Sequence, residues 1–291
     1  MKKNLCIVCC YLIATVFLAS CQYIEITEDA EADANVILRF SAFGQEDFTR
    51  AAVPLSDQLS RLSVAVFDAD GQKVKSINQQ STTDGFGTVA MDLMEGTYNI
   101  VAIAHNGTEG NATITSVEKV TFASNKVTDT FAYFGELSVL DGSVIEKDLT
   151  MTRRVAMVRF TLTDADLSAS QLKFYYTGGS STFSPSSGYG CVNSKQTEYR
   201  SCLSTGDGGA VTIYEIYTFP HEETDDLKVT VTALDASGNA IGENTFESVP
   251  VQRNKITTWT GEMFNGLGGG TSSGVNTSFK VDIDWNGMIN F

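Results

Sequence analysis

Apolar residues recur at every second position along much of this chain from residue 35 onward. Val36, Leu38 and Phe40 show this period and predict a β-strand at residues 36–43. Similar segments predict further strands at residues 61–67, 88–93, 97–104, 155–162, 171–176, 211–219, 227–234, 240–251 and 255–263. No segment shows a convincing helical period. Short strands with turn signals about every ten residues predict an all-β protein with β-sandwich architecture.

One predicted strand differs from the others because it is apolar almost without interruption. Residues 98–104 read Tyr-Asn-Ile-Val-Ala-Ile-Ala. A strand that is covered on both faces does not need alternating polar positions. We therefore expect this strand at the centre of a sandwich.

A turn signal, Asp68-Ala69-Asp70-Gly71, follows the second predicted strand. Its Asp-Gly ending supplies the positive-φ residues that a tight hairpin needs. A calcium loop is disfavoured because Gln72 and Lys73 stand where further oxygen ligands would be needed. Residues 62–74 align with residues 229–241 at an offset of 167, and both turns share Asp, Ala and Gly. This echo favours two related domains.

The length of the chain also favours two domains. The 291 residues include a leader of 20 residues that we expect to be removed. A second unit begins near Asp148, where a polar stretch leads into a new strand. We therefore expect an N-terminal β-sandwich at residues 35–147 and a C-terminal β-sandwich at residues 148–291.

The leader has the layout of a lipoprotein signal peptide. Lys2 and Lys3 precede an apolar run that ends at Leu18, and small residues follow up to Ser20 and Cys21. The thiolate of Cys21 is the nucleophile that would take a diacylglyceryl group, and cleavage between Ser20 and Cys21 would make Cys21 the first residue of the mature chain. The run is too short for the ~20 apolar residues of a membrane span. We therefore expect a chain that is anchored by lipid through Cys21.

Charge narrows the range of partners. Removal of residues 1–20 takes away two lysines and no acidic residue, which leaves 18 basic and 35 acidic residues and a formal charge of −17. This charge argues against nucleic-acid binding and against adsorption on anionic headgroups. Residues 21–34 are rich in Asp and Glu and are expected to form an acidic tether. Acidic residues just after the lipidated cysteine are also a candidate address for the outer surface of the membrane.

Few residues suit catalysis or metal binding. Cys191 and Cys202 are either a disulfide pair or two free thiols in a loop. No CxxC, HExxH or histidine cluster exists, so we expect no metal and no cofactor. His105 and His221 are the only histidines, and no carboxylate pair is marked for acid–base chemistry. We expect a protein that is not an enzyme, with a glycosidase as the weakest alternative.

Several sequence blocks, taken in order, resemble a known family. They are RLSVAVFDADG (61–71), MEGTYNIVAIAHNG (94–107), LTMTRRVAMVRFTL (149–162) and VPVQRNKITTWTGEMF (249–264), after the lipoprotein signal. Together they resemble the fimbrillin superfamily of outer-membrane fimbrial subunits and anchors. The resemblance implies two transthyretin-like β-sandwich domains in tandem. It also implies assembly with other fimbrial subunits into surface fibres for adhesion and biofilm formation.

The resemblance further implies a processing step and strand exchange. In that family an arginine-specific protease cuts the loop after the first strand, and a neighbouring subunit supplies a strand for the open groove. Arg50, followed by Ala51, is the best candidate for such a cut, with Arg61 as its competitor. The alternative is that Arg50 is an ordinary loop arginine.

The C-terminus is a candidate donor strand. Phe279, Val281, Ile283 and Trp285 alternate with polar residues and give residues 275–291 one apolar face. The same pattern suits the last strand of the chain's own second domain, because period two cannot separate the two kinds of pairing.

A different class of function also fits a lipidated β-sandwich. A monomeric, surface-anchored protein that binds glycans on host or bacterial surfaces would need exposed aromatic side chains. Tyr175, Tyr176, Phe183 and Tyr189 around the loop at 178–190 are the candidates. Buried strand aromatics are the alternative for Tyr175 and Tyr176.

Overall fold

The computed structural model describes residues 34–43, 55–163, 169–203, 211–263 and 279–282. Within these ranges the regular secondary structure is almost entirely β-strand, and the helices are α2 (Leu55–Gln58) and the short 3-10 helix η1 (Ala123–Asn125). The all-β class predicted from the sequence is confirmed. The chain from Ala34 onward forms one compact unit.

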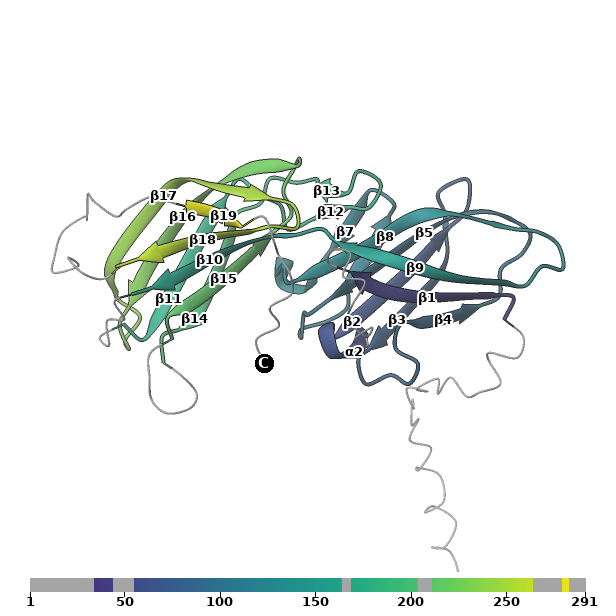
Figure 1. Ribbon diagram of the computed structural model, residues 1–291, viewed down its shortest axis with the longest axis horizontal. Helices are drawn as coiled ribbons and strands as arrows, with labels where there is room; N and C mark the ends of the chain where they lie inside the picture. Colours follow the sequence, from purple (N-terminus) through teal and green to yellow (C-terminus); the bar gives the residue numbers. More distant parts are fainter. Residues whose placement is uncertain (1–33, 44–54, 164–168, 204–210, 264–278, 283–291) are drawn as a thin grey trace, which may run out of the picture. The chain divides into compact units, whose positions relative to one another are not determined.

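The first large sheet has seven strands. Their order is β3 (Lys73–Gln80), β2 (Arg61–Phe67), β5 (Gly96–His105), β8 (Thr130–Val139), β9 (Ile145–Arg153), β1 (Val36–Phe43) and β4 (Thr88–Met91) (Figure 1). β8 and β9 share only the register pairs Phe131↔Arg153 and Ala132↔Thr152. Apolar side chains from both sides of this junction meet in one core, so the sheet bends there into a sandwich.

β2 and β5 are buried on both faces. One face of each strand joins the sandwich core, through residues such as Val64 and Ile100. The other face, with Phe67 and Ile103, joins a second cluster that includes Phe219 from the later half of the chain. The nearly continuous apolar run at 98–104 is thereby explained, and the prediction of a strand covered on both sides is confirmed.

The later half of the described chain forms two four-stranded sheets. One has the order β15 (Ile213–Thr218), β10 (Ala156–Leu162), β18 (Ile256–Gly261) and β19 (Phe279–Asp282), and the other has the order β14 (Gln196–Ser201), β11 (Gln171–Thr177), β16 (Thr224–Leu234) and β17 (Ala240–Gln252). Both sheets contribute to one core around Trp259, Phe160, Phe174 and Phe246. This is the β-sandwich that the alternation of the sequence predicted.

A small fourth sheet joins strands from the two halves. Its order is β13 (Tyr189–Gly190), β12 (Phe183–Ser184), β7 (Lys119–Thr121) and β6 (Thr113–Ser116). The register pair Phe183↔Val120 connects residues far apart in the sequence. The division into two domains stays a prediction. The expected boundary at 147/148 falls within β9, which pairs with β1 through Thr152.

The sequence echo corresponds to two hairpins with the same hydrogen bonds. In the β2–β3 turn, the amide of Asp68 donates to Gln72 O (2.9 Å) and the amide of Gly71 donates to Asp68 O (3.0 Å). In the β16–β17 turn, Asp235 donates to Asn239 O (2.9 Å) and Gly238 to Asp235 O (3.0 Å). Gly71 and Gly238 both have positive φ, at 76° and 82°. The turn prediction is confirmed.

Several strands were missed in the sequence. β6, β7, β8, β9 and β14 lie where no strand was expected. In β8, Thr130, Phe131 and Ala132 are all buried, whereas Tyr133, Phe134 and Gly135 are only partly buried. The burial of this strand therefore changes along its length, and neither simple alternation nor a continuous apolar run reveals it.

Candidate functional site

The first strand, β1, is the candidate site that the family resemblance marks most clearly. Val36 and Leu38 are fully buried and Phe40 is 6% exposed. β1 pairs in parallel with β9 from Val36 to Phe43, and it pairs antiparallel with β4 from Val36 to Arg39. β4 has no other strand neighbour in the described sheet (Figure 1). Loss of β1 would therefore leave β9 at an edge and β4 without a partner.

Polar contacts hold the start of β1 in place. The Asn35 side chain donates to Leu93 O (2.7 Å) and accepts from the Leu93 amide (2.9 Å). The Asn35 carbonyl accepts from the Ile145 amide (2.8 Å). The Arg39–Glu146 ion pair is about half exposed, so it contributes little. The stability of β1 comes mainly from its buried apolar face and its backbone pairing.

The last described strand, β19, lies at the edge of a sheet. It pairs antiparallel with β18, with Phe279 opposite Trp259 and Lys280 opposite Thr258. Phe279 packs against the C-terminal core, and its ring meets the Phe246 ring edge-on at 5.4 Å. The structure thus has the intramolecular pairing that the sequence left open as an alternative. Ile283 and Trp285 lie outside the described residues.

Other predicted site residues also lie outside the described ranges. They include Ser20 and Cys21 at the expected lipidation site, the acidic tether as far as Asp33, and Arg50 with Ala51 at the expected protease site. Lipidation and processing stay predictions. Among the described residues, no helix is both long and apolar enough to span a membrane.

Of the two alternatives left open for Cys191 and Cys202, the structure has the two free thiols. Cys191 is exposed and its Sγ lies 3.6 Å from Thr182 O, whereas Cys202 is buried in the C-terminal core. Burial raises the pKa of both thiols. The two cysteines are close in sequence, but β14 runs between them, and its six residues span about 20 Å. A disulfide needs Cα atoms within about 7 Å.

The four aromatic residues considered for a glycan-binding surface do not form one exposed surface in the structure. Tyr176 and Phe183 are buried, at 1% and 0% exposed. Tyr175 is 36% exposed, and the half-buried Tyr189 ring is covered by the Arg253 guanidinium at 4.6 Å from its centroid. Tyr175 and Tyr176 follow each other in one strand and point to opposite faces, so they cannot share a surface.

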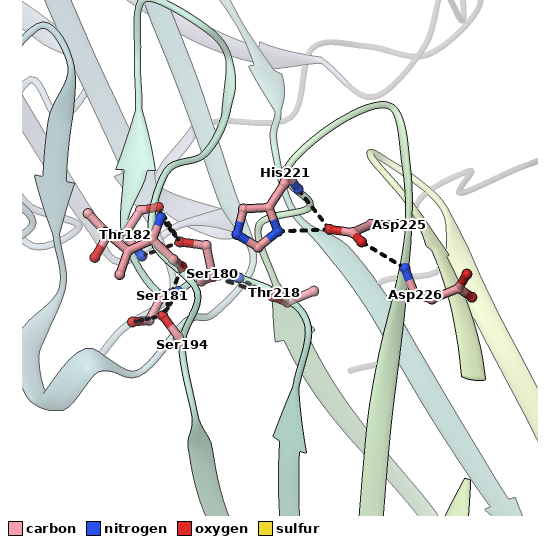
Figure 2. A network of polar contacts seen from close by, with 9 residues as sticks. Ser180, Ser181, Thr182, Ser194, Thr218, His221, Asp225 and Asp226 are labelled. Carbon is pink, nitrogen blue, oxygen red and sulfur yellow. Dashed lines mark hydrogen bonds and ion pairs between the residues drawn. The ribbon is translucent and has the colours of Figure 1, made fainter. Parts of the chain in front are cut away.

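A serine, histidine and aspartate group raises the question of nucleophilic catalysis. Figure 2 shows its hydrogen bonds, in which His221 Nδ1 lies 2.9 Å from Asp225 Oδ2. The Ser180 hydroxyl donates to Thr182 O (2.7 Å) and accepts from the Thr182 and Val192 amides. Ser180 is only 1% exposed. Its hydroxyl is engaged in the fold, so the group fixes loops and does not present a nucleophile.

Asp225 serves the same structural purpose. Burial raises the pKa of Asp225, but hydrogen bonds from His221 and from the Asp226 amide outweigh it and lower this pKa overall. The carboxylate therefore stays charged and holds the turn between β15 and β16. Within the described ranges, no three His, Cys, Asp or Glu residues gather in a way that could hold a metal ion.

His105 at the end of β5 is buried and neutral. Burial, with a smaller effect of the Arg61 charge, lowers the pKa of His105 from 6.5 to about 4. Its Nδ1 accepts a hydrogen bond from the Gly107 amide (2.9 Å), which places the proton of the neutral ring on Nε2. The burial of His105 agrees with a structural role at the end of this strand.

This pKa predicts a pH-dependent stability. Between pH 6.5 and pH 4 the unfolded chain binds a proton at residue 105 that the folded chain does not, so stability is lost as the pH falls. We expect a loss of about 2–3 kcal/mol between pH 7.5 and pH 4.5 from this residue alone. Urea unfolding of the wild type and of His105→Asn at both pH values isolates it, because carboxylate effects are shared. Equal losses in both proteins would refute the assignment.

The fold and these contacts define an all-β sandwich protein whose first strand is an integral part of its sheet. The chain belongs to the family of fimbrillin-A associated anchor proteins Mfa1 and Mfa2, whose family model matches residues 27–289. The family resemblance inferred from the sequence blocks is confirmed. No protein of curated function matches this chain in sequence.

Solved structures that this chain resembles come from Bacteroides and Porphyromonas species. A candidate adhesin from Bacteroides thetaiotaomicron is 16% identical, with 78% of this chain and 91% of that chain covered and a TM-score of 0.47. A candidate polysaccharide-binding protein from the same organism is 15% identical, with 72% and 80% covered and a TM-score of 0.48. The fimbrial anchor protein Mfa2 from Porphyromonas gingivalis is 13% identical, with 77% and 89% covered and a TM-score of 0.44. At this identity the likeness concerns the fold alone.

Proposed function

We propose that this chain is a fimbrial anchor lipoprotein, held in the outer membrane by lipid on Cys21 and joined to fimbrial subunits by strand exchange. Family membership supports the anchor role. The observation that carries the proposal is the pairing of β1 on both sides, with β9 and with the edge strand β4. An anchor keeps its first strand together with its lipid, and this strand is costly to remove.

In this proposal the lipid and the fold have separate tasks. Each buried lipid methylene contributes about 0.8 kcal/mol, so two or three acyl chains hold the chain in the membrane stably. Fibres that assemble on the lipid-anchored chain would then mediate adhesion and biofilm formation. No catalytic step is involved, which agrees with the engagement of Ser180 in the fold.

The proposed exchange uses the edge at β18 and β19. β19 has four residues and one strand neighbour, so its release exposes fewer hydrogen bonds than release of an inner strand. The strand that leaves could fill the groove of a neighbouring subunit with Phe279 and Val281. Main-chain pairing would supply affinity, and these alternate side chains would supply specificity.

A reversible lock tests this exchange. Thr258 and Lys280 lie opposite each other in the antiparallel pair, where Cα atoms are about 4.5–5.5 Å apart, within the range of disulfides, so Thr258→Cys with Lys280→Cys should form a disulfide. Cys191→Ser is added to both variants to remove the exposed thiol. We expect the oxidised double-cysteine variant to be at least about tenfold less abundant in purified fimbriae than the control, and a reductant should restore its abundance. Lys280→Cys alone, in the same background, is the matched control. If the oxidised double variant assembles as well as this control, β19 does not exchange.

A further inference from the structure

Two arginine side chains from distant parts of the chain meet beside Gly188. Arg154 lies between β9 and β10, and Arg253 lies in the turn between β17 and β18. Arg154 Nη1 is 3.2 Å and Arg253 Nη1 is 3.4 Å from the point where a Cβ atom on Gly188 would lie. Gly188 has positive φ, at 78°, in the hairpin between β12 and β13. Three connections of the fold thus bring two positive charges to one place.

Arg253 has its counterion within the fold. Its Nη2 lies 2.7 Å from Glu223 Oε2, which also accepts from the Tyr189 hydroxyl at 3.2 Å. The Arg253 guanidinium lies over the Tyr189 ring, 4.6 Å from the ring centroid. These contacts fix the position of the guanidinium. They leave its Nη1 without an acceptor among the described residues.

Arg154, in contrast, has no counterion in the part of the chain that the structure describes. Its side chain makes no hydrogen bond or ion pair there, and its Nε is fully buried without a partner. Burial and the Arg253 charge both lower the pKa of Arg154. The interaction with Tyr189 raises this pKa, but no described carboxylate does. A partly buried charge without a counterion is costly.

The terminal nitrogen atoms of the two arginines stay accessible. The Arg253 side chain is 25% exposed, and Arg154 is partly exposed. Nε is the only nitrogen atom of the Arg154 side chain that is both fully buried and without a partner. The Arg154 Nη atoms have no described partner either, so they keep contact with solvent. A ligand therefore reaches both Nη1 atoms without rearrangement of the core.

The exposed donors favour an oxyanion as ligand. Guanidinium groups bond strongly to carboxylate oxygens through paired N–H···O bonds. Arg154 and Arg253 carry two positive charges and Glu223 balances one of them, so one negative charge remains to be supplied. A carboxylate supplies one charge and has two oxygen atoms, which give each Nη1 its own acceptor. A sulfate dianion would instead place a second negative charge close to Glu223.

We propose that Arg154 and Arg253 bind the carboxylate group of a small organic acid, whether the anion is free or carried on a sugar ring. One carboxylate oxygen accepts from Arg154 Nη1 and the other accepts from Arg253 Nη1. Binding gives Arg154 the counterion that the fold does not supply. The site uses neither β1 nor β19, so it does not depend on the proposed anchor role.

Titration of the full mature chain with acetate and glucuronate, followed by NMR at constant ionic strength in sodium chloride, tests the proposal. Two charge-assisted hydrogen bonds should give a dissociation constant on the order of a few mM. Methyl glucoside, which is neutral, should bind at least about tenfold more weakly than glucuronate. Tighter binding of glucuronate than of acetate indicates a sugar-borne carboxylate, and the reverse indicates a free one. If neither binds below about 50 mM, or if sulfate or methyl glucoside binds best, the proposal is wrong.

Substitutions of Arg154 link the binding to this site. Arg154→Gln should weaken binding about tenfold or more, and Arg154→Lys, which keeps the charge, should weaken it less. Arg154→Gln should not lower the unfolding midpoint of the ligand-free chain, because it removes a charge without a counterion. Arg39→Gln, which removes a half-exposed arginine of β1, is the matched control and should keep the affinity. Unchanged affinity in Arg154→Gln, or an equal loss in Arg39→Gln, would overturn the proposal.

Discussion

A chain that begins at Ala51, and so lacks β1, should fail to form a stable seven-stranded sheet. Val36, Leu38 and Phe40 are at most 6% exposed, and burial of each side chain is worth about 1.5–3 kcal/mol. Their loss costs roughly 5–9 kcal/mol, which is comparable to the whole stability of a typical domain. β4 also loses its strand partner. Thermal unfolding followed by circular dichroism should show a midpoint at least about 10 °C lower, or no cooperative transition.

The control for this prediction is a chain that begins at Ala34 and keeps β1. It should unfold within about 2 °C of the mature chain, because residues 21–33 lie outside the compact unit. A synthetic peptide of residues 34–43 added in excess should restore part of the lost stability, since it can rebuild the pairing with β9 and β4. If the chain that begins at Ala51 is as stable as the mature chain, β1 is not needed for the stability of the seven-stranded sheet.

A strand could be predicted from the sequence where one burial pattern, either alternation or a continuous apolar run, extends along most of its length. β1 alternates between buried and less buried positions, β10 does so from Val158 onward, and β5 is apolar throughout its later part, so their sequences reveal them. β8 is harder because its burial changes along its length. The small sheet of β6, β7, β12 and β13 is harder still. Its strands are two to four residues long, too short to show any period.

The candidate site was less predictable than the fold, because its contacts come from distant parts of the chain. The sequence reveals β1 as a strand, but no local sequence pattern indicates its parallel pairing with β9, which lies over a hundred residues later. The sequence left the pairing of Cys191 and Cys202 open because β14 was not visible between them. His105 had the clearest signal, as a lone histidine at a strand end.

The second large effect concerns the N-terminus of the chain in assembled fibres. If β1 is as costly to remove as its burial indicates, the chain that serves as anchor keeps residues 21–50 and the lipid on Cys21. A chain cut after Arg50 would instead lose its lipid together with Val36, Leu38 and Phe40. An incoming strand would then have to rebuild the parallel pairing with β9 and the antiparallel pairing with β4 at once. We therefore expect the uncut form essentially alone.

Mass spectrometry of the N-terminal peptide tests this central claim most directly, on chain that copurifies with fimbriae from outer membranes. Our account predicts an acylated Cys21 at the N-terminus, and peptides from residues 34–50 in the same stoichiometry as peptides from the C-terminal half. An N-terminus at Ala51, with no peptide from residues 21–50, would contradict it and would identify the chain as a processed fibre subunit.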